Sequence, residues 1–136
     1  MDTPARDRPR ILVIDDNEAV VATLRVLLER EGYEIISGGT CREGTELAAT
    51  CRPDVILLDW ILPDGNGPML LGTLKELCGA PCMMVTAQDT PEHCVLALEA
   101  GCDDFIAKPL RPEELLLRLR RLLSRKDNAA STDAAT

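Results

Sequence analysis

The chain has 136 residues, 46% of them hydrophobic and 28% charged, which is typical of one globular domain. Its formal net charge of -8 and aromatic content of 2% argue against direct nucleic-acid binding, because phosphates repel an acidic surface and bases stack on aromatic rings. No apolar run resembles a signal peptide or approaches the roughly 20 residues that span a bilayer. We therefore expect a cytoplasmic protein that does not bind membranes.

Five short apolar runs predict five β-strands, and a segment with helical periodicity follows each of them. The strands are expected at residues 10–14, 33–36, 55–58, 82–85 and 104–107. The helices are expected at roughly 18–31, 40–50, 67–78, 91–100 and 112–126. The loop Asp15-Asp16-Asn17 is rich in N-cap residues, Thr90-Pro91 is typical of a helix start, and Gly32 and Gly79 suit helix ends.

The alternation of strand and helix predicts the α/β class. We expect a single doubly wound (βα)5 domain, flavodoxin-like, with a parallel five-stranded sheet of order 2-1-3-4-5 and helices on both faces. This domain should occupy residues 10–125. Residues 1–9 are predicted to be a flexible lead-in, and residues 126–136 a disordered tail or a truncated linker. The third helix is expected to bury Leu70, Leu71, Leu74 and Leu77.

The six cysteines are predicted to be free, buried thiols rather than zinc ligands. They form no C-x-x-C pair, and His93 is the only histidine in the chain. In a reducing compartment such thiols pack as small apolar core residues.

Charged and polar side chains stand where four of the predicted strands end. Asp15 and Asp16 follow the first strand, Asp59 the third and Lys108 the fifth, while Thr86 ends the fourth. Carboxyl ends of parallel strands meet at one edge of a sheet, so these side chains should converge there. Alone, Asp15 and Asp16 would fit a helix cap with a solvated acid as well as they would fit a cation site. Convergence with Asp59 favours a site for a hard cation such as Mg²⁺, which relieves the repulsion between carboxylates.

This set of residues resembles the receiver domain of bacterial response regulators, over about residues 10–124. Four stretches carry the resemblance, in this order: Ile11-Leu12-Val13-Ile14-Asp15-Asp16, Pro53-Asp54-Val55-Ile56-Leu57-Leu58-Asp59, Leu62-Pro63-Asp64-Gly65-Asn66-Gly67, and Gly101-Cys102-Asp103-Asp104-Phe105-Ile106-Ala107-Lys108-Pro109. Such domains work in two-component signal transduction. The resemblance implies that Asp59 accepts a phosphoryl group from the phosphohistidine of a sensor histidine kinase or phosphotransfer protein, helped by Lys108 and Mg²⁺.

The resemblance also assigns the supporting roles. It implies that Asp16, Asp59 and the backbone carbonyl of Ile61 bind Mg²⁺, with Asp15 acting through water. It further implies that Thr86 hydrogen-bonds the new phosphate and forms a switch with Phe105. The peptide bond between Lys108 and Pro109 is expected to be cis. Such a domain catalyses only its own phosphorylation and dephosphorylation, and is not otherwise an enzyme.

Two positions depart from the usual pattern. Phe105 has no hydroxyl group, so any switching must come from the packing of its ring. Ile61 is apolar where relatives often carry a polar or sulfur side chain, so it offers no side-chain help to a hydrolytic water.

The sequence also suggests an output surface on the fourth and fifth helices. Leu117 falls off the buried stripe of the last helix, and opposite charges surround it. Val95 and Leu98 fit either the core or this surface. The residues of this partner interface are Val95, Leu98, Asp104, Leu117 and Arg118. The surface resembles the dimer face of the winged-helix branch of the family, which implies a homodimer on phosphorylation.

Three alternative interpretations fit the sequence less well. A haloacid-dehalogenase-like phosphatase needs a second aspartate two residues after the nucleophile, where this chain has Ile61. A nucleotide-binding module needs a glycine-rich loop after the first strand, where this chain has Asp15-Asp16-Asn17-Glu18. A pseudo-receiver that only binds proteins would not need all five site positions intact.

Overall fold

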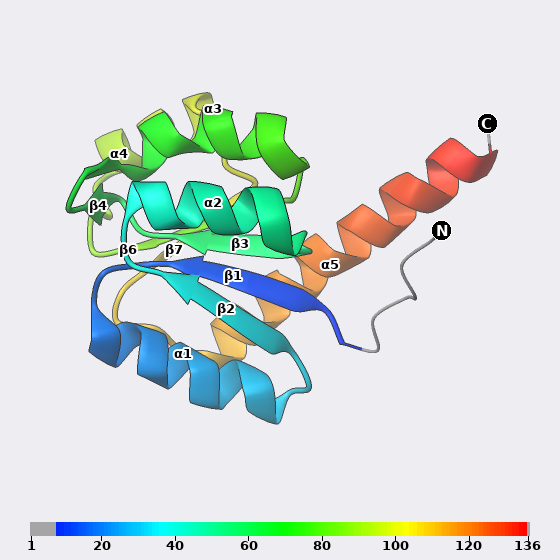
Figure 1. Ribbon diagram of the computed structural model, residues 1–136, viewed down its shortest axis with the longest axis horizontal. Helices are drawn as coiled ribbons and strands as arrows, with labels where there is room; N and C mark the ends of the chain where they lie inside the picture. The colour runs from blue at the N-terminus through cyan, green and yellow to red at the C-terminus, as the bar shows by residue number, and fades with distance from the viewer. Residues whose placement is uncertain (1–7, 136) are drawn as a thin grey trace.

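The structure is a computed structural model that describes the backbone of residues 8–135 and the side chains of residues 8–125. Five parallel strands form one sheet, in the order β2 (Glu34–Gly38), β1 (Arg10–Ile14), β3 (Val55–Leu58), β6 (Cys82–Thr86) and β7 (Asp104–Ala107) (Figure 1). The predicted order 2-1-3-4-5 is confirmed, since β6 and β7 are the fourth and fifth strands of the sheet. The order reverses between β1 and β3.

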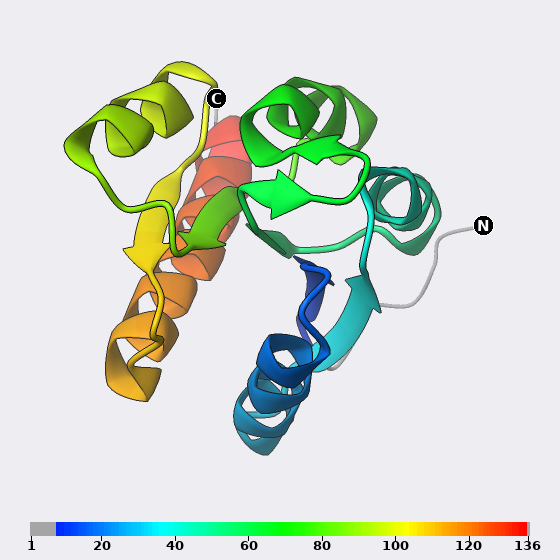
Figure 2. The same cartoon turned by 90° about the vertical axis from the view of Figure 1, so that its left-hand side faces the viewer.

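Five helices cover the two faces of the sheet. They are α1 (Glu18–Arg30), α2 (Cys41–Cys51), α3 (Gly67–Cys78), α4 (Pro91–Glu99) and α5 (Pro112–Ala135). Figure 2 shows α1 and α5 on one side of the sheet and α2, α3 and α4 on the other. The predicted (βα)5 architecture with helices on both faces is therefore confirmed.

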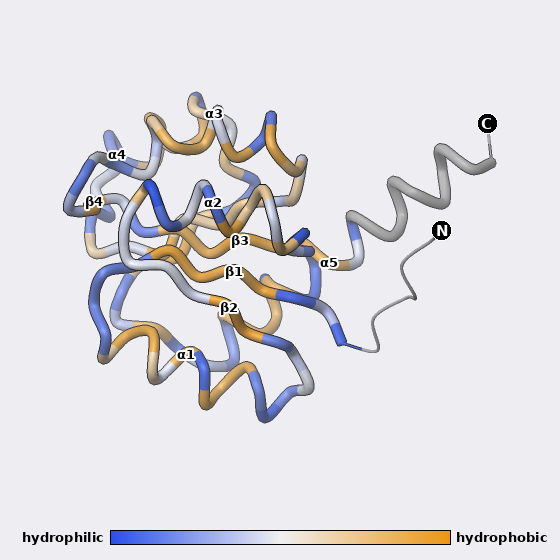
Figure 3. Tube along the Cα trace, viewed as in Figure 1, coloured by the Kyte–Doolittle hydropathy of each residue, from blue (hydrophilic) through white to orange (hydrophobic). Residues whose placement is uncertain are grey.

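Two hydrophobic layers hold these helices to the sheet, because successive strand residues point to opposite faces. Val13 and Leu57 pack in the layer that includes Leu24 of α1 and Leu119 of α5. The other layer joins alternate strand residues to α2, α3 and α4, and its strand residues are Leu12, Ile14, Ile56, Leu58, Cys82 and Met84. All four residues of β3 are buried, so the apolar run forms a central strand covered on both faces (Figure 3).

A small antiparallel hairpin that the sequence did not predict follows β3. It consists of β4 (Ile61–Leu62) and β5 (Gly65–Asn66). Asp64 in its turn accepts hydrogen bonds from the backbone N–H groups of Cys41 (2.7 Å) and Arg42 (3.1 Å) at the start of α2. These hydrogen bonds hold the pKa of Asp64 below its usual value, and the bond from Cys41 contributes most. The hairpin is thereby tied to α2, and it fixes the loop that begins at Asp59.

One other expectation, the burial of Leu77, needs correction. Leu77 is 42% exposed rather than buried, because it lies in the last turn of α3 and periodicity alone does not tell where the covering sheet ends. Helix α5 is described as far as Ala135. The predicted boundary of the receiver domain at residue 125, with a disordered tail or a truncated linker after it, stays a prediction. Most of the predicted lead-in lies outside the described residues.

No helix within residues 8–135 is both long and apolar enough to cross a bilayer.

One glycine is required by a close backbone approach. A Cβ atom at Gly67, the first residue of α3, would lie 2.5 Å from the carbonyl oxygen of Asp59 and 2.8 Å from Cε of Met84. The backbone N–H of Gly67 also donates to the carbonyl oxygen of Trp60 (2.7 Å). The start of α3 is thus pressed against the loop that carries Asp59.

We expect Gly67→Ala to lower the free energy of unfolding by about 1–3 kcal/mol, because the added methyl group forces the backbone near Asp59 to move. Gly72→Ala is the matched control in the same helix, since its Cβ would meet nothing within 4 Å. The control should stabilise the protein by about 0.5–1 kcal/mol through helix propensity. Urea unfolding of both variants measures the difference, and equal stability would contradict the role given to Gly67.

Candidate active site

The carboxyl edge of the sheet brings the predicted site residues together. Asp15 and Asp59 follow directly after the adjacent strands β1 and β3, and the backbone N–H of Asp59 donates to the carbonyl oxygen of Ile14 (2.9 Å). Lys108 follows β7, and its backbone N–H donates to the carbonyl oxygen of Thr86 (3.0 Å). The ends of four strands therefore supply this edge, at the point where the strand order reverses.

Three carboxylates meet at this edge. Each of Asp15, Asp16 and Asp59 offers an oxygen, and these oxygens all lie within 4.8 Å of one another. Asp15 is buried, Asp59 is half-buried and Asp16 is exposed. Asp15 is further held by the backbone N–H of Asn17, which donates to its Oδ1 (2.9 Å). Asn17 also caps α1 through its own side chain. The cluster is therefore rigid on its buried side and open at Asp16.

Lys108 supplies a positive charge to this cluster. Its Nζ donates to Oδ2 of Asp15 (2.8 Å) and to Oδ2 of Asp59 (3.1 Å). Desolvation by burial opposes the charge on Lys108, but the hydrogen bonds and charges of Asp15 and Asp59 outweigh it and raise its pKa above the usual value. Lys108 is thus charged at neutral pH and joins the two carboxylates. The cis peptide bond between Lys108 and Pro109 is as predicted.

Trp60 was missed as a partner of the central carboxylate. Its backbone N–H donates to Oδ1 of Asp59 (2.6 Å), so the two oxygens of Asp59 have different partners. Hydrogen bonds between adjacent residues leave no periodic signal, and the sequence therefore could not reveal this one. The indole of Trp60 meets the ring of His93 edge to face, with 4.7 Å between the centroids.

Thr86 ends β6, and Phe105 lies on the neighbouring strand β7, where it pairs with Met84. Thr86 is buried, and its Oγ1 accepts a hydrogen bond from the backbone N–H of Gln88 (3.1 Å). Phe105 is half-buried and packs against the layer under α4. Their roles as a switch stay predictions.

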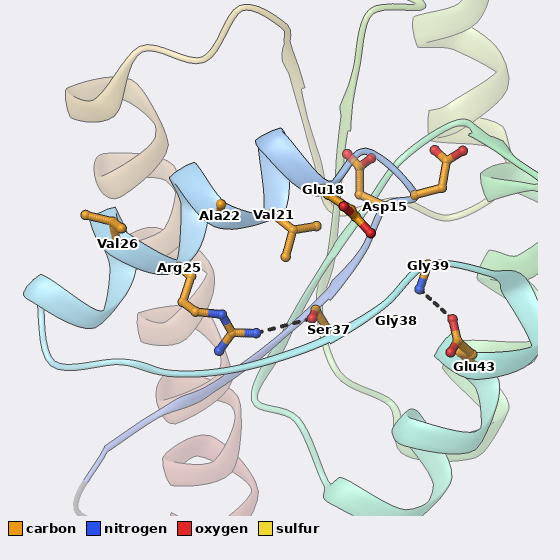
Figure 4. A pocket seen from close by; sticks show the side chains of 11 residues that line it. Asp15, Glu18, Val21, Ala22, Arg25, Val26, Ser37, Gly38, Gly39 and Glu43 are labelled. Atoms are coloured by element: carbon orange, nitrogen blue, oxygen red, sulfur yellow. Dashed lines mark hydrogen bonds between the residues drawn. The ribbon is translucent and has the colours of Figure 1, made fainter.

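A cavity of about 630 Å³ opens beside the acid cluster, between α1 and the end of β2 (Figure 4). Asp15 and Glu18 line the end nearest the cluster. Arg25 and Ser37 lie at the opposite end, where the guanidinium donates to the hydroxyl (3.2 Å). The acid cluster is therefore reachable from solvent on this side, and the approach to it is negatively charged.

The predicted partner interface is partly exposed and partly paired within the chain. Val95, Leu98 and Leu117 are 52%, 56% and 57% exposed, so none of them belongs to the core. Arg118 donates to Oδ1 of Asp104 (2.7 Å), which fixes both charges on the surface between α4 and α5. Ile61, the predicted carbonyl ligand, is exposed in β4.

Comparison with known proteins assigns this arrangement to a family. A family model described as the response regulator receiver domain matches residues 11–120. The chain belongs to the response regulator receiver family. This finding decides against the phosphatase and nucleotide-binding alternatives.

Receiver domains of several organisms are similar to this one. The DNA-binding response regulator MtrA of Mycobacterium tuberculosis strain H37Rv is 38% identical over 121 residues, which cover 89% of this chain and 53% of MtrA. The alkaline phosphatase synthesis transcriptional regulatory protein PhoP of Bacillus subtilis is 38% identical over 122 residues, covering 89% of this chain and 51% of PhoP. This receiver chain spans about half the length of these curated relatives.

Solved structures share the fold. The receiver domain protein of Methanospirillum hungatei JF-1 superposes with a TM-score of 0.86 at 33% identity, covering 90% of this chain and 99% of that one. The BeF3-activated receiver domain of Klebsiella pneumoniae RstA gives a TM-score of 0.80 at 29% identity, covering 84% and 97%. The receiver fold therefore extends over nearly all the described residues.

We expect Lys108→Met to destabilise this receiver by about 3 kcal/mol, because the change leaves carboxylates of the cluster without their cation. The raised pKa of Lys108 sets the pH dependence. Stabilisation from a raised pKa is full below the unfolded pKa of about 10.5 and is lost as pH rises through the folded pKa. The difference in the free energy of unfolding between wild type and Lys108→Met should therefore be largest at about pH 8 and should shrink above about pH 10.5.

Arg120→Gln is the control for this experiment, since Arg120 forms an exposed ion pair with Glu31 and should contribute only about 0–1 kcal/mol. Urea unfolding across the pH range measures both variants. A Lys108→Met protein as stable as the control would show that Lys108 does not neutralise the cluster.

Proposed function

We propose that this domain is the phosphoacceptor of a two-component pathway and that Asp59 is the acceptor residue. The proposal rests on one observation above all. The Nζ of Lys108 lies within hydrogen-bond distance of both Asp59 and Asp15, so a fixed cation stands beside the central carboxylate of the acid cluster. A half-buried carboxylate with a cation beside it is suited to phosphoryl transfer, which depends mainly on positioning and on neutralising charge.

The reaction proposed is transfer from a phosphohistidine of a sensor histidine kinase or a phosphotransfer protein. An oxygen of Asp59 attacks phosphorus and forms a new P–O bond, while the P–N bond to the donor imidazole breaks. The imidazole nitrogen keeps the electron pair of that bond. Lys108 stabilises the negative charge on the phosphoryl oxygens, and the domain catalyses only this reaction and the later hydrolysis.

The donor set at the acid cluster fits Mg²⁺. Three carboxylates within 4.8 Å provide the hard oxygen ligands that this ion prefers, and one lysine leaves their charge incompletely balanced. Asp16, Asp59 and the backbone carbonyl of Ile61 are the proposed ligands, with Asp15 acting through water. When bound, Mg²⁺ supplies neutralisation of charge on the transferred phosphoryl group.

The new phosphate is proposed to act through Thr86 and Phe105. Thr86 ends β6. Within the described residues, the hydrogen bond of its hydroxyl is the one that it accepts from the backbone N–H of Gln88. Its hydroxyl hydrogen can therefore turn to a phosphate oxygen. Phe105 on the neighbouring strand packs near α4, so a shift of Thr86 would be transmitted to the surface formed by α4, β7 and α5.

We expect the wild-type domain to gain one phosphoryl group from a small acyl phosphate in the presence of Mg²⁺, and to gain none when the metal is chelated. Asp59→Asn should stay unmodified, because an amide oxygen is a poor nucleophile. Asp64→Asn is the matched control, five residues further along, where asparagine can still cap α2. Intact mass spectrometry measures the products.

Phosphate on Asp59→Asn at the wild-type level would place the acceptor elsewhere. No phosphate on the wild-type protein would support the pseudo-receiver alternative.

A second proposal concerns the output of the domain. We infer that phosphorylation promotes a homodimer through the face of α4, β7 and α5, whose proposed contact residues are Val95, Leu98, Asp104, Leu117 and Arg118. Three apolar side chains that are each more than half exposed belong to this face together with an ion pair, and such a mixture suits a self-complementary two-fold contact.

MtrA and PhoP are named as DNA-binding and transcriptional regulators. The acidic charge of this chain supports the proposal that the receiver itself does not contact nucleic acid.

We expect sedimentation to show a monomer–dimer shift when beryllium fluoride and Mg²⁺ are added as a phosphoryl mimic. Leu117→Glu and Arg118→Glu should abolish this shift, because each places a new charge in the apolar contact or against Asp104. Leu77→Glu is the control, since Leu77 is also exposed but lies on α3. A mimic-dependent dimer that survives both interface variants would move the interface to another face.

A further inference from the structure

We propose that His93 is a positioning residue for Asp59, acting through the indole and the backbone of Trp60. The inference rests on the proposed phosphoacceptor role of Asp59 and adds to it a residue outside the five positions named from the sequence. It starts from a chain of three contacts, from the carboxylate to Trp60, from Trp60 to His93, and from His93 into helix α4.

The first contact fixes one oxygen of the acceptor. Oδ2 of Asp59 accepts from Lys108 (3.1 Å), whereas Oδ1 accepts from the backbone N–H of Trp60 (2.6 Å). The phosphoryl group must form on one of these two oxygens. The peptide of Trp60 therefore touches the reacting carboxylate and helps to set its orientation.

The second contact holds the side chain of Trp60. The indole is half-buried against the layer of α2, α3 and α4, and its ring meets that of His93 at 4.7 Å with an interplanar angle of 81°. Edge-to-face pairs at this distance are attractive beyond the area that they bury. His93 thus restrains the residue whose peptide restrains Asp59.

The third contact fixes the imidazole itself. Nδ1 of His93 lies 2.6 Å from Oγ1 of Thr90, and the same oxygen accepts the backbone N–H of His93 (3.2 Å) as the N-cap of α4. The ring is therefore tied to the first turn of the helix. Its position follows that of the helix start.

Helix α4 has few other attachments, which makes this contact important. Ala97 is its one fully buried residue, and Val95, Leu96 and Leu98 are each more than half exposed. A helix held by so little buried surface moves at low cost. Because coupling between sites is reciprocal, a helix start that positions Asp59 must also respond to phosphate on Asp59. This route enters α4 through Trp60 and is separate from the one proposed through Thr86 and Phe105.

The rate of phosphorylation by acetyl phosphate with Mg²⁺, followed by intact mass, tests the inference. His93→Ala removes the ring contact and should slow phosphorylation roughly three- to tenfold. His93→Phe keeps an aromatic edge against Trp60 and should stay within about twofold of wild type. Leu96→Ala changes an exposed apolar residue of the same helix and should leave the rate unchanged.

A double-mutant cycle separates positioning from a general loss of structure. In a Trp60→Leu background the partner ring is already gone, so adding His93→Ala should cause no further slowing. Circular dichroism confirms that each variant is folded before its rate is measured. Equal slowing by His93→Ala in both backgrounds would show that the histidine acts independently of Trp60 and would overturn the inference.

The outcomes also separate this inference from the proposed function. If wild type and His93→Ala gain phosphate at the same rate, the phosphoacceptor role stands and the positioning role fails. If wild type gains no phosphate, both fail.

Discussion

The structure depends on relieving the repulsion among three carboxylates whose oxygens lie within 4.8 Å of one another. Neighbouring parallel strands force Asp15 and Asp59 together, because both strands end at the same edge of the sheet. Burial strengthens the repulsion, and Lys108 relieves part of it by bonding to both carboxylates. The negative charge that remains is the charge that the proposed Mg²⁺ would neutralise.

The two oxygens of Asp59 lead into two parts of the molecule that differ in how firmly they are held. Through Lys108 the carboxylate is joined to the loop after β7, and β7 pairs with the deeply buried strand β6. Through Trp60 it is joined to α4, which buries a single residue completely. Asp59 therefore contacts a firmly packed sheet on one side and a weakly held helix on the other, and the response that we propose to phosphorylation lies in the helix.

Much of the fold was predictable because its signals are local or periodic. The four buried residues of β3 form one continuous apolar run, and the cap residues Asn17 and Thr90 stand where α1 and α4 begin. The hairpin of β4 and β5 was not predictable, because two-residue strands have no period and Asp64 stabilises the hairpin by bonding to a distant helix. The exposure of Leu77 was likewise invisible, since it depends on where another element ends.

The sequence by itself determined which side chains reach the carboxyl edge of the sheet, because a strand that ends on a charged residue delivers that residue to the edge whatever packs around it. Asp15, Asp59 and Lys108 were identified in this way. Only the tertiary structure decided which contacts these side chains make. Lys108 donates hydrogen bonds to both Asp15 and Asp59, and the backbone N–H of Trp60 donates to the other oxygen of Asp59. The ring of His93 packs edge to face against the indole of Trp60. These contacts join either residues that are far apart in the chain or two adjacent residues, and neither kind leaves a periodic pattern in the sequence.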